Sequence, residues 1–357
     1  MSIAVDLDTY MKRFTPGGTQ TRSKSGLFPA PVAIRSARGS RVIDDEGREY
    51  VDWISGLCAI TLGYRHAEVD EAVTRQIRDH GVTFPLATRA EAVVAERLCE
   101  ALKWPEQVRW VKTGSEATAA AILVARAATG RRKIVSVGYH GWHPEHLPGP
   151  DLIALPFNAR SAAEAITGET AAVILELLRD GSAPQEWLGG IVQRARDLGA
   201  LVIMDEIVTG FRWAIGGATE FLHLDPPDLA CFGKGMANGY PLGALVGPTK
   251  LMRHAVNVSS TFGGEGIGLA ACKATLDIYE REKVIERLWK TGTALSRALG
   301  EAGIRHVGYP VHPKLLGPPG EASARAAAKG VLLIASGLNP TAAHTPEDIA
   351  ETAKALA

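Results

Sequence analysis

The sequence is poor in cysteine, and it contains no long hydrophobic run. Its four cysteines stand far apart and form no Cys-x-x-Cys pair, so neither a disulfide framework nor a zinc site is expected from Cys58, Cys99, Cys231 and Cys272. No apolar run approaches the roughly 20 residues that a membrane-spanning helix needs. Residues 1–8 carry acidic groups where a signal peptide has a basic stretch and then an apolar one. These absences lead us to expect a cytoplasmic protein.

Neither sign of charge is in excess. Lysine plus arginine and aspartate plus glutamate both number 39, which gives a formal net charge of zero. Neither nucleic acid nor an anionic membrane is therefore expected as a partner. The 357 residues are 46% apolar and 22% charged, the balance of an ordinary globular protein, and they suffice for a large domain with a smaller companion.

Short apolar runs alternate with helical stretches between about residues 66 and 330. Runs that are short and almost wholly apolar are typical of a parallel sheet covered on both faces. We therefore predict an α/β fold with a mostly parallel central sheet and helices on both of its faces. The runs lie at 108–111, 133–137, 171–175, 201–204 and 229–232.

The two ends of the chain have a different pattern. Residues 1–35 are rich in Gly, Pro, Ser and Thr and predict an extended arm, which a pair of strands follows at 40–44 and 49–53. Near the other end, Thr345 and Pro346 suit the cap and the first turn of a last helix. We expect the two ends to build a small α/β domain.

Three parts of the chain are predicted on this basis. The arm and the first strands of the small domain occupy residues 1–50, the large domain occupies 51–284, and a shortened C-terminal part of the small domain occupies 285–357.

Residues that follow the apolar runs are the candidates for a site, because ligands of open α/β sheets bind beyond the carboxyl ends of the strands. Asp205 follows the run that ends at Met204, where a carboxylate is costly unless a cation faces it. Lys234 stands between two glycines directly after Phe232, and a lysine partly removed from water is a usable nucleophile. Alone, Asp205 could equally be half of a structural ion pair and Lys234 a solvated loop residue.

Two further segments follow predicted strands. The segment 112–118 opens an alanine-rich helix with Thr, Gly and Ser, which suits an anion site made of free amide groups, although an ordinary capped helix explains it as well. The segment 138–142 adds an aromatic side chain at the same edge. Together, a phosphate cradle, an aromatic plate, a carboxylate and a lysine are the set that pyridoxal 5′-phosphate (PLP) needs. The combination predicts a PLP enzyme.

The chain resembles the class III (fold type I) PLP-dependent aminotransferases, and most of all their glutamate-1-semialdehyde 2,1-aminomutase branch. The shared patterns, from about residue 15 onward, are Pro-Gly-Gly, Gly-Ser-Glu-Ala-Thr, Tyr-His-Gly, Asp-Glu-Ile-Val-Thr-Gly-Phe-Arg, Gly-Lys-Gly and Thr-Phe-Gly-Gly. The resemblance implies a compact fold type I transferase with PLP as its cofactor and pyridoxamine 5′-phosphate as an intermediate. It also implies ping-pong transfer of an amino group from a small-molecule donor to a ketone or aldehyde.

The same resemblance assigns roles around the cofactor. It implies that Lys234 forms the Schiff base and then carries the proton, and that Asp205 pairs with the pyridine nitrogen. Other matched positions bind the cofactor. Gly114 and Ser115 hold its phosphate, Tyr139 covers one face of its ring, Ile207 packs on the other face, and His140 is a further cofactor-binding position.

Four more positions match single residues of the family. Thr261 matches a residue that reaches the phosphate of the neighbouring subunit, which implies a homodimer. Glu176 matches the glutamate of a Val-Glu-Pro segment whose proline is replaced by leucine in this chain. Arg22 matches an arginine that binds a substrate carboxylate, and a solvated arginine explains it equally well. Leu57 stands at a substrate-pocket position that is usually tryptophan.

One departure from the aminomutase branch bears on the reaction. Aminomutases carry a long mobile segment after Tyr-His-Gly that retains the intermediate, whereas only a short stretch separates Trp142 from the apolar run at Leu152 in this chain. This favours a transaminase. A 1,2-aminomutase or a racemase remains an alternative, and a non-catalytic truncated homologue is a second one. A metal site at His140, His143 and His146 is disfavoured, since no acidic residues accompany them and Pro144 interrupts the spacing.

Overall fold

The computed structural model describes residues 7–24, 33–157, 159–178, 185–318, 320–334 and 337–357. The chain divides into two compact units. The larger unit is Ala67–Ile285, and the smaller unit combines Met1–His66 with Glu286–Ala357. Each unit is described by itself.

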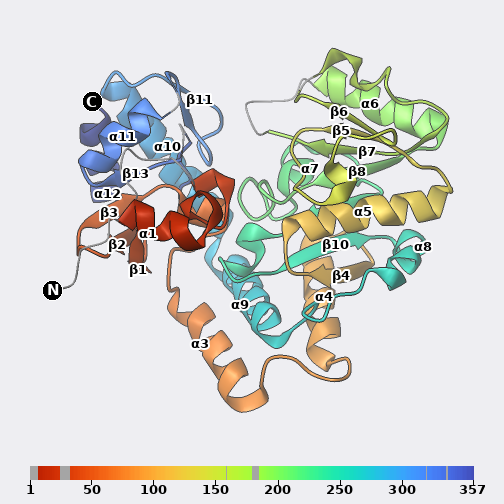
Figure 1. Ribbon diagram of the computed structural model, residues 1–357, viewed down its shortest axis with the longest axis horizontal. Coiled ribbons are helices and arrows are strands. Elements are labelled where there is room, and N and C mark those ends of the chain that lie inside the picture. Colours follow the sequence, from red (N-terminus) through yellow and green to blue (C-terminus); the bar gives the residue numbers. More distant parts are fainter. Residues whose placement is uncertain (1–6, 25–32, 158, 179–184, 319, 335–336) are drawn as a thin grey trace. The chain divides into compact units, whose positions relative to one another are not determined.

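A seven-stranded sheet forms the centre of the larger unit (Figure 1). Five of the strands are parallel, with β7 pairing with both β5 and β8. Strand β10, the last of the seven in sequence, pairs antiparallel with both β9 and β4 at one side of the sheet. In spatial order the strands are β4 (Gln107–Val111), β10 (Gly243–Gly247), β9 (Leu229–Phe232), β8 (Leu201–Asp205), β7 (Thr170–Glu176), β5 (Lys133–Val137) and β6 (Leu152–Leu155).

The predicted mostly parallel sheet is confirmed, and each of the five apolar runs forms one of its strands. Every residue of β7 is buried, as expected for a strand that is covered on both faces. The antiparallel strand β10 was not among the predicted runs. It begins at Gly243 and ends at Gly247, so only three consecutive apolar residues lie between the glycines and its pattern does not stand out from the surrounding loops.

Helix α5 packs against the sheet through small side chains. Its residues Ala117, Ala120 and Ala121 are buried in one apolar cluster with Ile174 of β7 and Ile203 of β8. Small side chains allow the helix to lie close to the strands, so its first turn is held near their carboxyl ends. The helices of this unit are α3 (Ala67–Arg75), α4 (Arg89–Leu102), α5 (Gly114–Thr129), α6 (Gln185–Leu198), α7 (Gly217–Phe221), α8 (Thr249–Met252) and α9 (Gly266–Glu282).

The smaller unit contains a four-stranded sheet in the order β1-β2-β3-β13. Strand β13 comes from the C-terminal part of the chain and pairs parallel with β3, so both chain ends build one sheet. A separate two-stranded hairpin joins β11 and β12. The strands are β1 (Ile34–Arg38), β2 (Arg41–Asp44), β3 (Glu49–Asp52), β11 (His306–Val307), β12 (Lys314–Leu315) and β13 (Val331–Leu332). The helices are α1 (Leu7–Phe14), α2 (Ser55–Cys58), α10 (Val284–Glu301), α11 (Glu321–Ala328) and α12 (Pro346–Leu356).

The two chain termini differ in how well the sequence predicted them. The last helix begins as expected: the Thr345 side chain accepts a hydrogen bond from the amide of Asp348, and Pro346 occupies the first turn. The extended arm, by contrast, is wrong over Leu7–Phe14, which forms α1. An ion pair between Asp8 and Lys12, one turn apart, supports this helix, and Pro16 follows only after its end. Within the described part of the chain, no helix is long and apolar enough to cross a membrane.

Candidate functional site

Strand register brings the candidate residues to one edge of the large sheet. Glu176 at the end of β7 lies opposite Asp205 at the end of β8, and Asp205 lies opposite Cys231 of β9. Lys234 follows three residues after Cys231, in the short turn η6 (Lys234–Ala237). The parallel strands therefore deliver a glutamate, an aspartate and a lysine to neighbouring positions at their carboxyl ends.

Asp205 is buried and makes two hydrogen bonds. Its Oδ1 accepts from the amide of Ile207 at 3.1 Å, and its Oδ2 lies 2.7 Å from Nδ1 of His140. A carboxylate only accepts, so Nδ1 of His140 donates to it; the other ring nitrogen, Nε2, lies 3.1 Å from the carbonyl oxygen of Val137. The buried carboxylate thus has a histidine partner, which offsets the cost of removing it from water.

Lys234 is half-buried and has a left-handed backbone conformation, with φ of 43°. Such a φ is unfavourable for a residue with a side chain, and it directs the chain sharply out of β9. Close packing surrounds the residue before it: a Cβ on Gly233 would lie 3.2 Å from Cδ1 of Ile207. The lysine is therefore held by a backbone that has little room to move.

The N-terminus of α5 has a capping box. Oγ1 of Thr113 accepts from the amide of Glu116 at 3.2 Å, and the Glu116 carboxylate accepts from the amides of Lys112 and Thr113. The cap satisfies the third amide of the helix, whereas the first two, those of Gly114 and Ser115, have no acceptor within a helix. A capped helix and an anion site are therefore compatible here.

Two glycines bring the segments of the site into direct contact. A Cβ on Gly114 would lie only 2.9 Å from Cγ2 of Ile207, so the first turn of α5 packs directly on the residue that follows β8. Gly141 has φ of 121°, and a Cβ there would collide with the Ser115 side chain. The Tyr-His-Gly segment consequently lies against the N-terminus of α5. One bound ligand could therefore contact this segment and the helix N-terminus at the same time.

Glu176 holds the backbone of the Tyr-His-Gly segment. The residue is buried, and its Oε2 accepts from the amide of Tyr139 at 3.2 Å. Gly138, with φ of 111°, lies so close to Glu176 that a Cβ on it would be 3.0 Å from Cβ of the glutamate. The Tyr139 side chain is 60% exposed and stands at the rim of this arrangement, open to a ligand.

The remaining predicted residues are Thr261, Leu57 and Arg22. Thr261 is exposed, in the loop before α9. Leu57 belongs to the smaller unit, in a left-handed turn where Ser55, Gly56, Leu57 and Cys58 all have positive φ. Arg22 also belongs to that unit, and its side chain lies outside the described part of the chain. The roles of Arg22 and Leu57 stay predictions.

The sequence did not identify two residues of the arrangement. Thr118 of α5 donates a 2.6 Å hydrogen bond to the carbonyl oxygen of His140, and Nε2 of His146 lies 3.0 Å from the same hydroxyl. Thr118 is the last residue of the Gly-Ser-Glu-Ala-Thr pattern, which was the available signal for it. In the sequence, His146 stands out only through its spacing from His140 and His143, and the described residues contain no cluster that could hold a metal.

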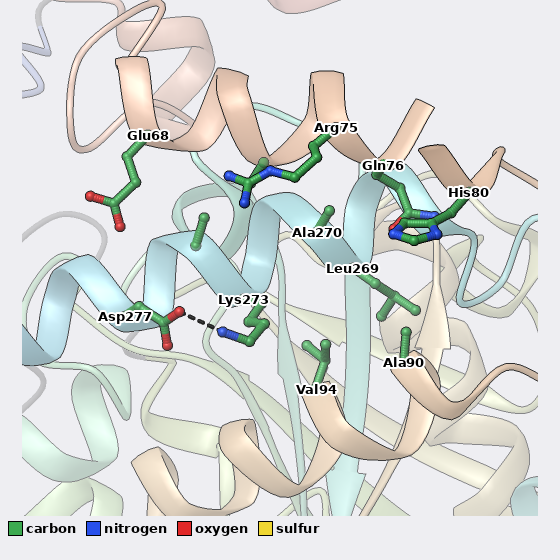
Figure 2. Close-up of a pocket in the computed structure, with 13 residues that line it drawn as sticks. Glu68, Arg75, Gln76, His80, Ala90, Val94, Leu269, Ala270, Lys273 and Asp277 are labelled. Carbon is green, nitrogen blue, oxygen red and sulfur yellow. Dashed lines mark hydrogen bonds and ion pairs between the residues drawn. The ribbon is translucent and has the colours of Figure 1, made fainter. Parts of the chain in front are cut away.

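A cavity of about 380 Å³ lies elsewhere in the larger unit, among α3, α4 and α9 (Figure 2). Its floor is apolar, with Val94 and Leu269, and its rim carries charged groups. The Lys273 ammonium on this rim is engaged by Asp277 at 2.7 Å. None of the candidate residues at the strand ends lines this cavity.

Comparison with known proteins identifies the family. The family model "Aminotransferase class-III" matches residues 23–147 and 150–339. The chain belongs to the class III aminotransferases. Its relatives include 3-aminobutyryl-CoA aminotransferase of Cloacimonas acidaminovorans, 33% identical over 82% of this chain and 78% of the relative. They also include glutamate-1-semialdehyde 2,1-aminomutase of Methanothrix thermoacetophila, 31% identical over 81% of this chain and 75% of the relative.

Solved structures agree with this family. The FumI protein of Sphingopyxis sp. MTA144, in its PLP internal aldimine form, superimposes with a TM-score of 0.90 at 28% identity, over 98% of this chain and 94% of that protein. The predicted fold type I architecture and the predicted family are confirmed. This class III aminotransferase is a PLP-dependent enzyme that takes an amino group from a small-molecule donor and gives it to a carbonyl acceptor.

The strand-end residues fit this cofactor. The first two amides of α5 have no acceptor within the helix, the contacts of Gly114 and Gly141 bring Ile207 and the Tyr-His-Gly segment against that turn, and a lysine and a histidine-paired carboxylate stand at the neighbouring strand ends. A helix N-terminus can bind the phosphate of PLP, a lysine amine can bind its aldehyde carbon, and a carboxylate can pair with its pyridine nitrogen.

Proposed function

We propose that the cluster at the strand ends is the PLP site of this aminotransferase. The amides and hydroxyl of Gly114 and Ser115 would hold the phosphate, and Lys234 would hold the cofactor through its ε-amine. Asp205 would pair with the pyridine nitrogen. Bound PLP supplies an electron-accepting ring and a carbon to which the amino group is transferred.

The protein residues around the cofactor have separate tasks in this proposal. Asp205 supplies a fixed negative charge to the ring nitrogen and neither gains nor loses a proton itself. The ε-amine of Lys234 would carry a proton between the α-carbon of the amino donor and the cofactor carbon that receives the amino group. Tyr139 and Ile207 would cover the two faces of the ring, and Glu176 fixes the amide of Tyr139, so that the tyrosine keeps its place at the rim.

The enzyme is proposed to be a transaminase that releases one product before it binds the next substrate. The observation that supports this is the shortness of the segment between Gly141 and strand β6. A single turn, η4 (Pro144–His146), is followed by a bridge between Gly149 and Leu152, where β6 begins. This length leaves no room for the long closing segment that an aminomutase uses to retain its intermediate.

An amino donor alone is expected to convert the enzyme stoichiometrically to its pyridoxamine form and then stall. Turnover resumes only when a carbonyl acceptor is added, because the two half-reactions use one open site in turn. Absorbance spectra with single donors, followed by initial rates with both substrates varied, measure this. Parallel double-reciprocal lines are expected.

A single amino-carbonyl compound serves as the control in the same assay. Sustained isomerisation of that compound with no second substrate would contradict the transaminase proposal and assign the enzyme to the aminomutases. Exchange of only the α-proton, with inversion at that carbon and no transfer, would assign it to the racemases.

The enzyme is further proposed to act as a homodimer in the cytoplasm. Thr261 would complete the phosphate site of the neighbouring subunit. Apolar side chains lie exposed on the two segments nearest to it: Phe262 beside it, and Phe84 and Leu86 in the loop whose Val82 carbonyl accepts from the amide of Gly266. Exposed apolar groups of this kind support a subunit interface. The cytoplasmic location rests on four separate cysteines, all of them free thiols.

Replacing Thr261 with valine is expected to weaken PLP binding by about three- to tenfold, the effect of one lost hydrogen bond. Ser260→Ala, one residue earlier, is the matched control and should bind PLP normally. If Thr261 acts across the interface, mixing Thr261→Val chains with Lys234→Ala chains restores one normal site in each mixed dimer. Equilibrium dialysis of the mixture measures this recovery. An active monomer in sedimentation, or no recovery on mixing, would contradict the dimer.

A further inference from the structure

Thr118 and His146 form a hydrogen-bonded link to the backbone of His140. The Thr118 side chain is fully buried on α5, and its hydroxyl lies 2.6 Å from the carbonyl oxygen of His140 and 3.0 Å from Nε2 of His146. The carbonyl oxygens of Gly114 and Ser115 lie at 3.1 Å from the same hydroxyl. One hydroxyl proton is therefore available to three carbonyl oxygens, and a donor is needed to satisfy the hydroxyl as an acceptor.

His146 is the group that can be this donor. Burial, and after it the neighbouring His140, lowers the pKa of His146 to about 4, so its ring is neutral near pH 7 and carries one N–H. With that proton on Nε2, His146 donates to Thr118 and the hydroxyl proton goes to the carbonyl of His140. The other tautomer would take the hydroxyl proton for itself and leave two oxygens 2.6 Å apart with no proton between them.

The link reaches the carboxylate at the end of β8 through a single residue. The backbone of His140 is held by Thr118, and its ring is held between Val137 and Asp205, so the residue is fixed on both sides. A shift of the His140 backbone would lengthen the 2.7 Å contact to Asp205. We propose that His146, acting through Thr118, is a positioning residue that fixes His140 against Asp205; the inference rests on the proposed role of Asp205 beside the cofactor ring.

Five variants test this link. His146→Leu removes the donor, and His146→Gln restores a donor at about the position of Nε2. Thr118→Val removes the hydroxyl at constant shape, and a double variant combines it with His146→Leu. His143→Leu is the matched control, because the His143 ring packs on Trp142 and takes no part in the link.

Two readouts are taken for each variant. The first is the rate of the donor half-reaction, measured by stopped flow together with the KM of the amino donor. The second is the chemical shift of the His140 ring nitrogens in PLP-free protein labelled with ¹⁵N-histidine. Thermal unfolding of each variant reports whether it is folded.

His146→Leu is expected to slow the half-reaction about three- to tenfold, with the KM of the donor unchanged and the His140 nitrogen signals shifted. His146→Gln should recover most of both properties, and His143→Leu should change neither. The double variant should be no slower than Thr118→Val alone, because both changes break one link.

Additive effects in the double variant, or His140 signals that stay at their normal positions in folded His146→Leu protein, would overturn the inference. If His146→Leu does not fold, the comparison of Thr118→Val with His146→Gln decides in its place: a slow His146→Gln enzyme with unshifted His140 signals overturns it. Failure of the proposed site is recognised separately, since borohydride would then attach PLP to a residue other than Lys234, while the nitrogen signals of the PLP-free protein still test the link.

Discussion

Lys234→Ala protein is expected to lose both its covalent link to PLP and its turnover. The wild-type enzyme, treated with borohydride, should retain PLP on a peptide that contains Lys234, and the variant should retain none. Turnover should fall by more than about 1,000-fold, because the variant loses the nucleophile and also the proton carrier, a type of group that alone contributes about 10²–10⁴-fold. Mass spectrometry of the reduced protein and a transamination assay measure the two effects.

Lys250→Ala is the control for this experiment. Lys250 is an exposed lysine on α8, away from the strand ends, and its replacement should leave both labelling and turnover as they are. A folded Lys234→Ala protein that still becomes covalently labelled and active would show that the central assignment is wrong.

Asp205→Asn protein is expected to keep bound PLP while its half-reaction slows by orders of magnitude. Asparagine preserves the shape of the side chain, and its amide oxygen can still accept from the amide of Ile207. The fixed negative charge is lost, however, and without it the ring nitrogen no longer stays protonated and the ring accepts electrons poorly. Exchange of the donor α-proton with deuterium, followed by NMR, measures the step directly.

A second aspartate on the same strand pair provides the comparison. Oδ2 of Asp228 accepts from the amide of Val202 at 2.8 Å, at the start of β8 rather than at its end. Asp228→Asn should lower stability slightly and leave α-proton exchange unchanged. Full exchange activity in Asp205→Asn protein would remove the electrostatic role from Asp205.

The large sheet could be predicted from the sequence because its central strands are buried on both faces. Strands β7 and β8 carry almost no polar residue before their carboxyl ends, so both their extent and the position of Asp205 are visible in the sequence. β10 has the same burial, but glycines at both of its ends leave only three apolar residues between them. Helix α1 occupies a part of residues 1–35 that contains no glycine or proline, and an ion pair one turn apart supports it. The flanking glycines hid the first element, and the composition of the whole segment hid the second.

The candidate site could be predicted in part, for a similar physical reason. Asp205 is the last residue of one buried strand and Lys234 comes two residues after the end of the next, so their place at the sheet edge follows from the fold. The contact of Thr118 with His146 joins residues that are 28 positions apart, and it depends on how a loop returns to a helix. Neither the hydrophobic periodicity nor a sequence motif predicts that this loop folds back onto the helix. The positions of Arg22 and Leu57 relative to the strand ends depend on how the two units are arranged, which local sequence does not encode.

The close approach of Gly141 to Ser115 also divides the loop that follows β5 into a part that tolerates change and a part that does not. Any side chain at position 141 would displace the chain from the start of α5, and the residues before it are fixed to Glu176 and Asp205. The next fixed point is His146, whose Nε2 lies 3.0 Å from the Thr118 hydroxyl, so insertions and deletions can accumulate only between His146 and the bridge at Gly149. In an engineered enzyme this interval is the place to graft a longer segment, since it can be extended there without disturbing the anchored turn or the strand that follows.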